Sequence, residues 1–116
     1  MNTLYIINNK ENKIINNPGD RKSIGGYNLS KREMEFSDYQ TEVEKGDMIY
    51  LFSDGIIDQN GPDRKKFGRI NLEEAIIDCA KLEPSKQKAI IEEKLSAYMQ
   101  KEEQRDDITL IGLKVK

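Results

Sequence analysis

The sequence predicts an α+β domain in which antiparallel strands pack against two helices in the C-terminal half of the chain. Two observations support this fold class. Short apolar runs bounded by turn residues lie near both ends of the chain, and two stretches between residues 71 and 103 carry apolar residues at helical spacing. With 116 residues, the chain forms one domain at most, so we treat residues 1–116 as a single unit.

Composition excludes several classes of protein. Nineteen Lys and Arg residues against 21 Asp and Glu residues leave a net charge of −2, which provides no positive field for nucleic acid. Because there is one cysteine and no histidine, an internal disulfide, a zinc finger and a histidine-based catalytic relay are all excluded. No apolar run approaches the roughly 18 residues of a membrane span. We therefore expect a cytoplasmic chain with no membrane contact by this segment.

The N-terminal region predicts two hairpins. Apolar residues 4–7 and 13–15 flank a polar stretch, as in a hairpin with a long turn. Residues 34–43 contain the alternation Tyr39, Thr41, Val43 with polar residues between, which is typical of a half-exposed strand. Turn residues 44–47 then lead into the next strand, so these two segments are expected to pair.

Residues 48–53 form the most apolar strand of the chain. Both alternating faces are apolar, which predicts a strand buried on both sides. The run stops abruptly at Asp54-Gly55, and an unpaired carboxylate at the end of a buried strand is costly. A cation is the natural complement of such a group.

A second acidic motif lies near the C-terminus. Asp106 and Asp107 directly precede residues 108–115, another strand with apolar residues on both faces. If this strand is the antiparallel neighbour of residues 48–53, the end of one strand and the start of the other meet at the same rim of the sheet. Asp54 would then converge with Asp106 or Asp107.

Two helices are expected between these strands. Asn71 followed by Glu74 has the pattern of a helix N-cap with its capping-box partner, and this helix ends before Pro84. The second helix starts at Ser85 and runs to about residue 103. Cys79 falls on the apolar face of the first helix, which indicates a core residue and not a nucleophile.

The loop before the first helix carries the basic triplet Arg64, Lys65 and Lys66. The simplest interpretation is a solvated loop. The alternative is a phosphate-binding role, because basic side chains near a metal site can hold a phosphorylated ligand.

In this order, the motifs resemble a known family. The run GDMIYLFSDG at residues 46–55, the Phe67-Gly68 pair, two helices and the run QRDDITL at residues 104–110 resemble the C-terminal half of metal-dependent serine/threonine phosphatases of the 2C type. Within that superfamily the chain is most similar to the bacterial branch typified by the stage II sporulation protein E phosphatase domain. The resemblance runs from about residue 4 to the end and implies part of an αββα sandwich and a role in bacterial signal transduction.

The resemblance also implies a metal centre. Family members bind two Mn²⁺ or Mg²⁺ ions, and a water bridging the ions attacks the phosphorus of phosphoserine or phosphothreonine. By position, Asp54 and Asp106 would be ligands of the same ion. Asp107 and Gly55 would lie beside these ligands or serve as alternative ones, and Arg64 is the candidate for the phosphate side. No side chain of this chain is assigned a catalytic role.

One family motif is absent. The Asp-Gly-Xaa-Gly motif, whose aspartate bridges the two ions, does not occur in residues 1–46. We therefore expect part of a phosphatase domain that binds at most one ion weakly and is inactive in isolation. The alternative is a catalytically silent, phosphatase-like binding or regulatory module. The expected partners are a phosphorylated regulatory protein of the anti-sigma-antagonist type and, because the sheet lacks its covering half, a second copy in a homodimer.

Overall fold

The computed structural model describes residues 3–18 and 40–116. In chain order, these residues form the following strands and helices: β1 (Thr3–Ile7), β2 (Ile14–Pro18), β3 (Met48–Phe52), α1 (Asp54–Ile57), α2 (Gly68–Cys79), α3 (Pro84–Met99) and β4 (Leu110–Lys114). The predicted α+β class is confirmed. The short helix α1, which directly follows β3, was not predicted.

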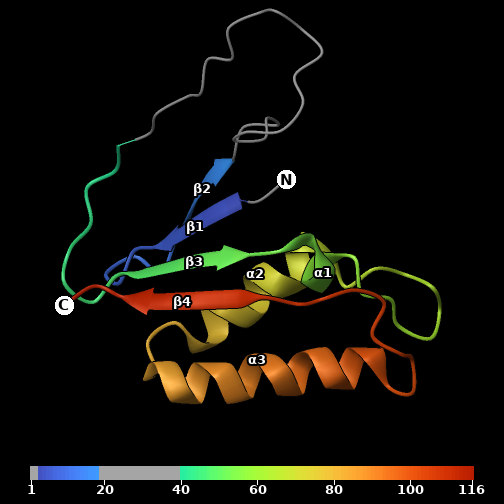
Figure 1. Cartoon of the computed structure of the whole chain (residues 1–116). Coiled ribbons are helices and arrows are strands. Elements are labelled where there is room, and N and C mark those ends of the chain that lie inside the picture. The colour runs from blue at the N-terminus through green and yellow to red at the C-terminus, as the bar shows by residue number, and fades with distance from the viewer. Residues whose placement is uncertain (1–2, 19–39) are drawn as a thin grey trace, which may run out of the picture.

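The four strands form one antiparallel sheet in the order β2-β1-β3-β4. β1 and β2 pair as the predicted hairpin, and β3 lies between β1 and β4 (Figure 1). The predicted hairpin between residues 34–43 and β3 is wrong, because both edges of β3 are already paired with β1 and β4. Residues 40–43 belong to no strand, and residues 34–39 lie outside the described part of the chain.

Helices α2 and α3 cover one face of the sheet (Figure 1). The core between the two layers is formed by buried side chains from the strands and from both helices, among them Tyr5, Ile7, Met48, Tyr50, Phe52, Leu72, Ile76, Cys79 and Ile91. The rings of Tyr5 and Phe52 pack with their centroids 5.0 Å apart. Cys79 is a core residue as predicted, and burial raises the pKa of its thiol, so the unreactive protonated form is favoured.

The opposite face of the sheet is apolar, and in the described residues it is exposed over parts of β3 and β4, whereas Ile6 of β1 on the same face is buried. Cross-strand neighbours Leu51 and Ile111 are 41% and 47% exposed, and Leu113, opposite Ile49, is 53% exposed. The prediction that β3 is buried on both sides is therefore wrong for the described part of the chain. One face of β3 packs on the helices, while the other is only partly covered by the residues that the structure describes.

The two long helices begin and end differently from the sequence prediction. α2 starts at Gly68, not after an Asn71 cap, because the Asn71 side chain donates to the carbonyl of Phe67 at 2.7 Å and lies inside the first turn. α3 starts at Pro84, a residue suited to the first helical turn, where its missing N–H is not needed. It ends at Met99, and Gln100 then adopts a positive φ of 53°.

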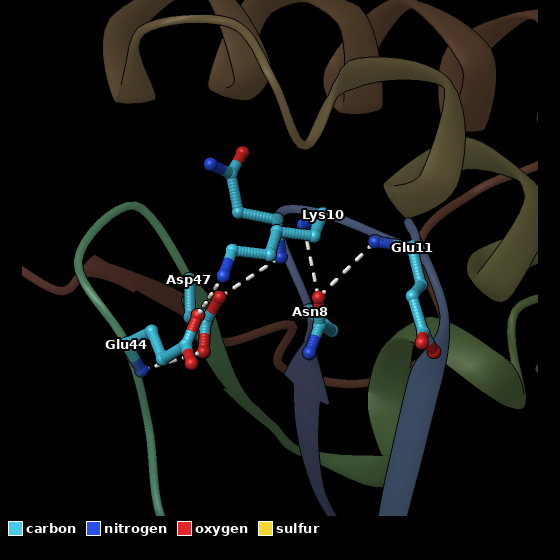
Figure 2. Close-up of polar contacts among 6 residues, drawn as sticks. Asn8, Lys10, Glu11, Glu44 and Asp47 are labelled. Atoms are coloured by element: carbon cyan, nitrogen blue, oxygen red, sulfur yellow. Dashed lines mark hydrogen bonds and ion pairs between the residues drawn. The ribbon is translucent and has the colours of Figure 1, made fainter.

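A buried aspartate closes the turn before β3. The carboxylate oxygens of Asp47 accept backbone N–H groups of Asn9 and Glu44, each at 2.8 Å. Nearby, Lys10 forms an ion pair with Glu44 at 3.2 Å (Figure 2). Gly46 has a φ of +94°, and a Cβ there would lie 2.7 Å from the Asn9 side chain. The Gly46-Asp47 pair therefore joins the β1–β2 turn to the start of β3.

Candidate metal centre

The predicted meeting of the two acidic segments is confirmed for the backbone. Phe52, the last residue of β3, pairs with Leu110, the first residue of β4. Beyond this pair, the Ser53 amide donates to the Thr109 carbonyl at 2.9 Å, and the Thr109 amide donates to the Ser53 hydroxyl at 3.0 Å. The segment containing Asp54 therefore leaves the sheet at the same rim where the segment containing Asp106 and Asp107 enters it.

Gly55 allows these two segments to touch. A Cβ at this position would lie only 2.0 Å from the carbonyl oxygen of Asp107 and 2.9 Å from its carbonyl carbon. Both neighbours are backbone atoms, which cannot rotate away as a side chain can. Any residue with a side chain would therefore push α1 away from the Asp107 segment, so Gly55 has a positioning role and Asp107 faces it through its main chain.

The aspartates occupy different environments on these segments. Asp54 is the first residue of α1 and is half-buried, and its carbonyl accepts the Asp58 amide at 2.9 Å. Asp106 and Asp107 are exposed. The Asp106 carboxylate accepts the Asp107 amide at 2.7 Å, and its carbonyl accepts the Gln104 side chain at 2.8 Å, so residues 104–107 form a compact turn.

Gln59, which the sequence did not single out, supports this turn. Its side chain is 1% exposed, donates to the Glu103 carbonyl at 2.9 Å and accepts the Arg105 amide at 3.2 Å. It therefore joins the chain just after α1 to the residues that lead into Asp106. Glutamine is usually a surface residue, and no spacing pattern around Gln59 marks it as buried.

The loop of Arg64 is held by α3. Asn60 and Lys66 form an isolated antiparallel β-bridge, and Arg64, which lies between them in the sequence, has a positive φ of 59°. The Tyr98 hydroxyl on α3 donates to the Lys65 carbonyl at 2.8 Å. The side chains of residues 64–66 are exposed, and Lys66 forms an ion pair with Asp58 at 3.1 Å. The loop is therefore solvated, and the phosphate-side role of Arg64 remains a prediction.

The donor chemistry at the rim suits a hard divalent cation, because Asp54, Asp106 and Asp107 supply carboxylate oxygens. The set is incomplete within the described residues. There, no group of three or more His, Cys, Asp or Glu side chains is placed to hold a metal ion. The roles of Asp54, Asp106 and Asp107 as metal ligands therefore remain predictions.

The fold is that of part of a protein phosphatase 2C domain. The chain is similar to the solved structure of the SiaA-PP2C domain of Pseudomonas aeruginosa, with a TM-score of 0.81 and 23% sequence identity. This match covers 99% of the present chain but 43% of the SiaA chain, so the protein spans less than half of that relative.

The family assignment comes from a second comparison. The family model for stage II sporulation protein E (SpoIIE) matches residues 4–116, and the chain belongs to this family of phosphatase-type domains. No curated protein matches the chain. Among the helices of the described residues, none is long and apolar enough to cross a membrane.

Proposed function

We propose that this chain supplies one half of a metal site in a bacterial protein serine/threonine phosphatase of the SpoIIE type. In this proposal, Asp54 and Asp106 hold one Mn²⁺ or Mg²⁺ ion. The complete domain, with two ions, hydrolyses phosphoserine or phosphothreonine in signal transduction. The chain by itself is inactive, because residues 1–46 lack the Asp-Gly-Xaa-Gly motif that supplies ligands to both ions in family members.

The observation that supports this proposal most directly is the contact between the Ser53–Gly55 and Asp107–Thr109 segments. It joins two acidic motifs that lie more than fifty positions apart in the sequence. A structural role alone would not require carboxylates at this rim, whereas a metal site does. Paired divalent ions, when bound, would lower the pKa of a coordinated water and neutralise charge on the phosphoryl group.

Each part of the rim has a defined task in this proposal. Asp54 is presented by the first residue of α1, directly after β3, so its backbone is positioned by the sheet. Asp106 is presented by the turn that Gln59 holds. Gly55 keeps the two segments in contact, Asp107 lies beside the ligands, and Arg64 orients the phosphorylated substrate from the loop before α2.

The proposed substrate is a small phosphorylated regulatory protein of the anti-sigma-antagonist type, and the proposed location is the cytoplasm. A single, buried cysteine that cannot form an internal disulfide is consistent with a reducing compartment. The net charge of −2 gives no support to a polyanionic partner.

The experiment is a Mn²⁺ titration of the intact 116-residue chain and of three matched variants. Binding is measured by isothermal titration calorimetry or electron paramagnetic resonance. Wild type is expected to bind one ion with a dissociation constant of about 1 mM. Asp54→Asn and Asp106→Asn are each expected to weaken binding by about tenfold or more. Asp63→Asn, the same change in an exposed loop, should leave the affinity unchanged.

Two results would overturn the proposal. The first is equal Mn²⁺ affinity in all four proteins, since Asp54 and Asp106 would then not be ligands. The second is a metal-dependent rate on p-nitrophenyl phosphate that survives Asp54→Asn, since hydrolysis would then use another site. Circular dichroism of each variant separates lost binding from lost structure.

A catalytically silent binding or regulatory module is the second candidate, and one observation favours it. Within the described ranges 3–18 and 40–116, no complete cluster of metal-ligating side chains is present. A silent module retains the rim but not the metal, so the absence of Mn²⁺ binding by the folded wild-type chain would support this candidate over the phosphatase.

A further inference from the structure

Ser53, the residue between β3 and α1, bonds to the opposite segment of the rim through its side chain as well as its main chain. The hydroxyl accepts the Thr109 amide at 3.0 Å and donates to the Asp107 carbonyl at 3.3 Å. The Ser53 amide donates to the Thr109 carbonyl at 2.9 Å. Ser53 is therefore tied to both ends of the short segment 107–109, which directly follows Asp106.

The hydroxyl takes the place of a backbone acceptor. In a hydrogen-bonded pair of an antiparallel ladder, each residue donates its amide to the carbonyl of the other. Ser53 and Thr109 are the next pair of the β3–β4 ladder, because Phe52 and Leu110 are partners. The Thr109 amide donates to the Ser53 hydroxyl, where a regular ladder would use the Ser53 carbonyl. A side chain has thus replaced the main chain at this position.

This replacement allows a strand to change into a helix at a single residue. Ser53 is extended, with φ −84° and ψ 160°, and α1 begins at the next residue, Asp54. The carbonyl of an N-cap residue accepts the first hydrogen bond of its helix. A serine at the N-cap usually accepts a helix amide with its hydroxyl, but the Ser53 side chain forms no capping bond. The hydroxyl is directed to the Asp107–Thr109 segment instead.

Ser53 and Gly55 contribute to the rim in different ways. Gly55 permits a close approach, because a side chain there would overlap the Asp107 carbonyl. Such a contact limits the distance between the segments but not their direction. A hydrogen bond is restricted in both distance and angle, so the Ser53 hydroxyl also sets how the two segments are aligned.

We propose that Ser53 is a positioning residue of the acidic rim. Its hydroxyl aligns the start of α1 with residues 107–109 and so determines where Asp54 lies relative to Asp106. A hydroxyl can accept and donate at the same time, so threonine can replace serine here and alanine cannot. The effect on ion binding rests on the proposed function, whereas the alignment of the two segments does not.

Amide hydrogen exchange tests the alignment without any metal. In Ser53→Ala, the Thr109 amide loses its acceptor and should exchange about tenfold faster than in wild type. Ser53→Thr keeps the hydroxyl and should restore the wild-type rate. The Ile111 amide, further along β4, reports the stability of the strand and should not change. Ser96→Ala, the same substitution at an exposed position on α3, should leave Thr109 unchanged.

Mn²⁺ binding tests the consequence for the carboxylates. Electron paramagnetic resonance should show about tenfold weaker Mn²⁺ binding by Ser53→Ala than by wild type, and near wild-type binding by Ser53→Thr and Ser96→Ala. A purely structural role would lower the stability of Ser53→Ala but leave the Mn²⁺ affinity of the folded protein unchanged. Circular dichroism confirms that each variant is folded at the temperature of the titration.

Three results would overturn the inference: equal exchange of the Thr109 amide in wild type and Ser53→Ala, failure of Ser53→Thr to restore the slow rate, or equal Mn²⁺ affinity of wild type and Ser53→Ala. The proposed function fails in a different way, through a folded wild-type chain that binds no Mn²⁺ or an affinity that Asp54→Asn does not change. In that case, the exchange of Thr109 and its rescue by threonine still decide whether Ser53 aligns the rim.

Discussion

An aspartate next to a glycine lies near each end of β3, and the two aspartates have different surroundings. At the start of the strand, both carboxylate oxygens of Asp47 accept main-chain N–H groups, and the side chain is buried. At the other end, Asp54 is half-buried at a rim shared with exposed Asp106 and Asp107. The comparison teaches that an aspartate beside a glycine in a strand motif can be a structural closure or a ligand candidate.

The largest effect on stability is expected at Asp47, the buried aspartate before β3. Asp47→Ala removes two charge-assisted hydrogen bonds and leaves the Asn9 and Glu44 amides without their acceptor, so the free energy of unfolding should fall by about 3 kcal/mol. Urea denaturation followed by circular dichroism measures this change. Asp54→Ala serves as the control and should lower stability by less than about 1 kcal/mol. Equal losses in both variants would contradict the assigned difference.

A second change tests the contact at the rim. Gly55→Ala introduces a Cβ that would overlap the Asp107 carbonyl, and the forced shift should destabilise the protein by about 2 kcal/mol. Gly68→Ala is the matched control, since its position has open space around the added Cβ and a φ of +76°. That variant should lose only about 1 kcal/mol from backbone strain. If Gly55→Ala is as stable as wild type, the two segments are not held in contact.

A smaller effect is expected where Gln59 supports the acidic turn. Gln59→Leu keeps the approximate volume but leaves the Glu103 carbonyl and the Arg105 amide without their partner, so stability should fall by about 1–2 kcal/mol. In the proposed metal site, the same variant should also weaken Mn²⁺ binding, because Asp106 follows directly. Gln104→Leu, an exposed neighbour, should reduce stability less. Chemical denaturation of both variants measures the difference.

The smallest effect concerns the middle of β3 at high pH. Burial raises the pKa of the Tyr50 hydroxyl and of the Cys79 thiol above their ordinary values of 10.0 and 9.0. The folded protein therefore keeps protons that the unfolded chain releases. Stability should be fully present below about pH 9 and decline as the pH rises further. Tyr50→Phe should flatten the decline above about pH 10, and an unchanged slope in thermal unfolding would contradict the assignment.

The antiparallel fold could be predicted where local patterns agree with tertiary contacts. The β1–β2 hairpin, the β3–β4 pairing and the two long helices all follow from apolar runs and their turns. The neighbours of β3 could not be predicted, and the expected hairpin of residues 34–43 with β3 is wrong. The alternation of apolar and polar residues in a strand does not specify which strand lies beside it. β3 pairs instead with β1 and β4, which are distant in sequence. α2 starts at Gly68 and not after Asn71, because Asn71 lies inside the helix and its side chain donates to the Phe67 carbonyl.

At the candidate site, the sequence predicted which segments meet but not how they are held. The motifs around Asp54 and Asp106 indicate a shared rim, and the backbone contacts confirm that their segments adjoin. Gln59 and the short helix α1 were missed, since a buried glutamine has no periodic signal and a four-residue helix has none either. The roles of Asp54, Asp106, Asp107, Gly55 and Arg64 toward a metal or phosphate stay predictions.

The pairing of Phe52 with Leu110 also constrains the order of events during synthesis. While the ribosome still holds the residues after α3, β3 can pair with β1 but not yet with β4. The segment of Asp106 and Asp107 has then not yet joined the segment that follows Phe52. The edge of β3 that pairs with β4 is therefore open until residues 110–114 have been synthesised. Chaperone binding to the growing polypeptide should be strongest in that interval and should drop once β4 leaves the exit tunnel.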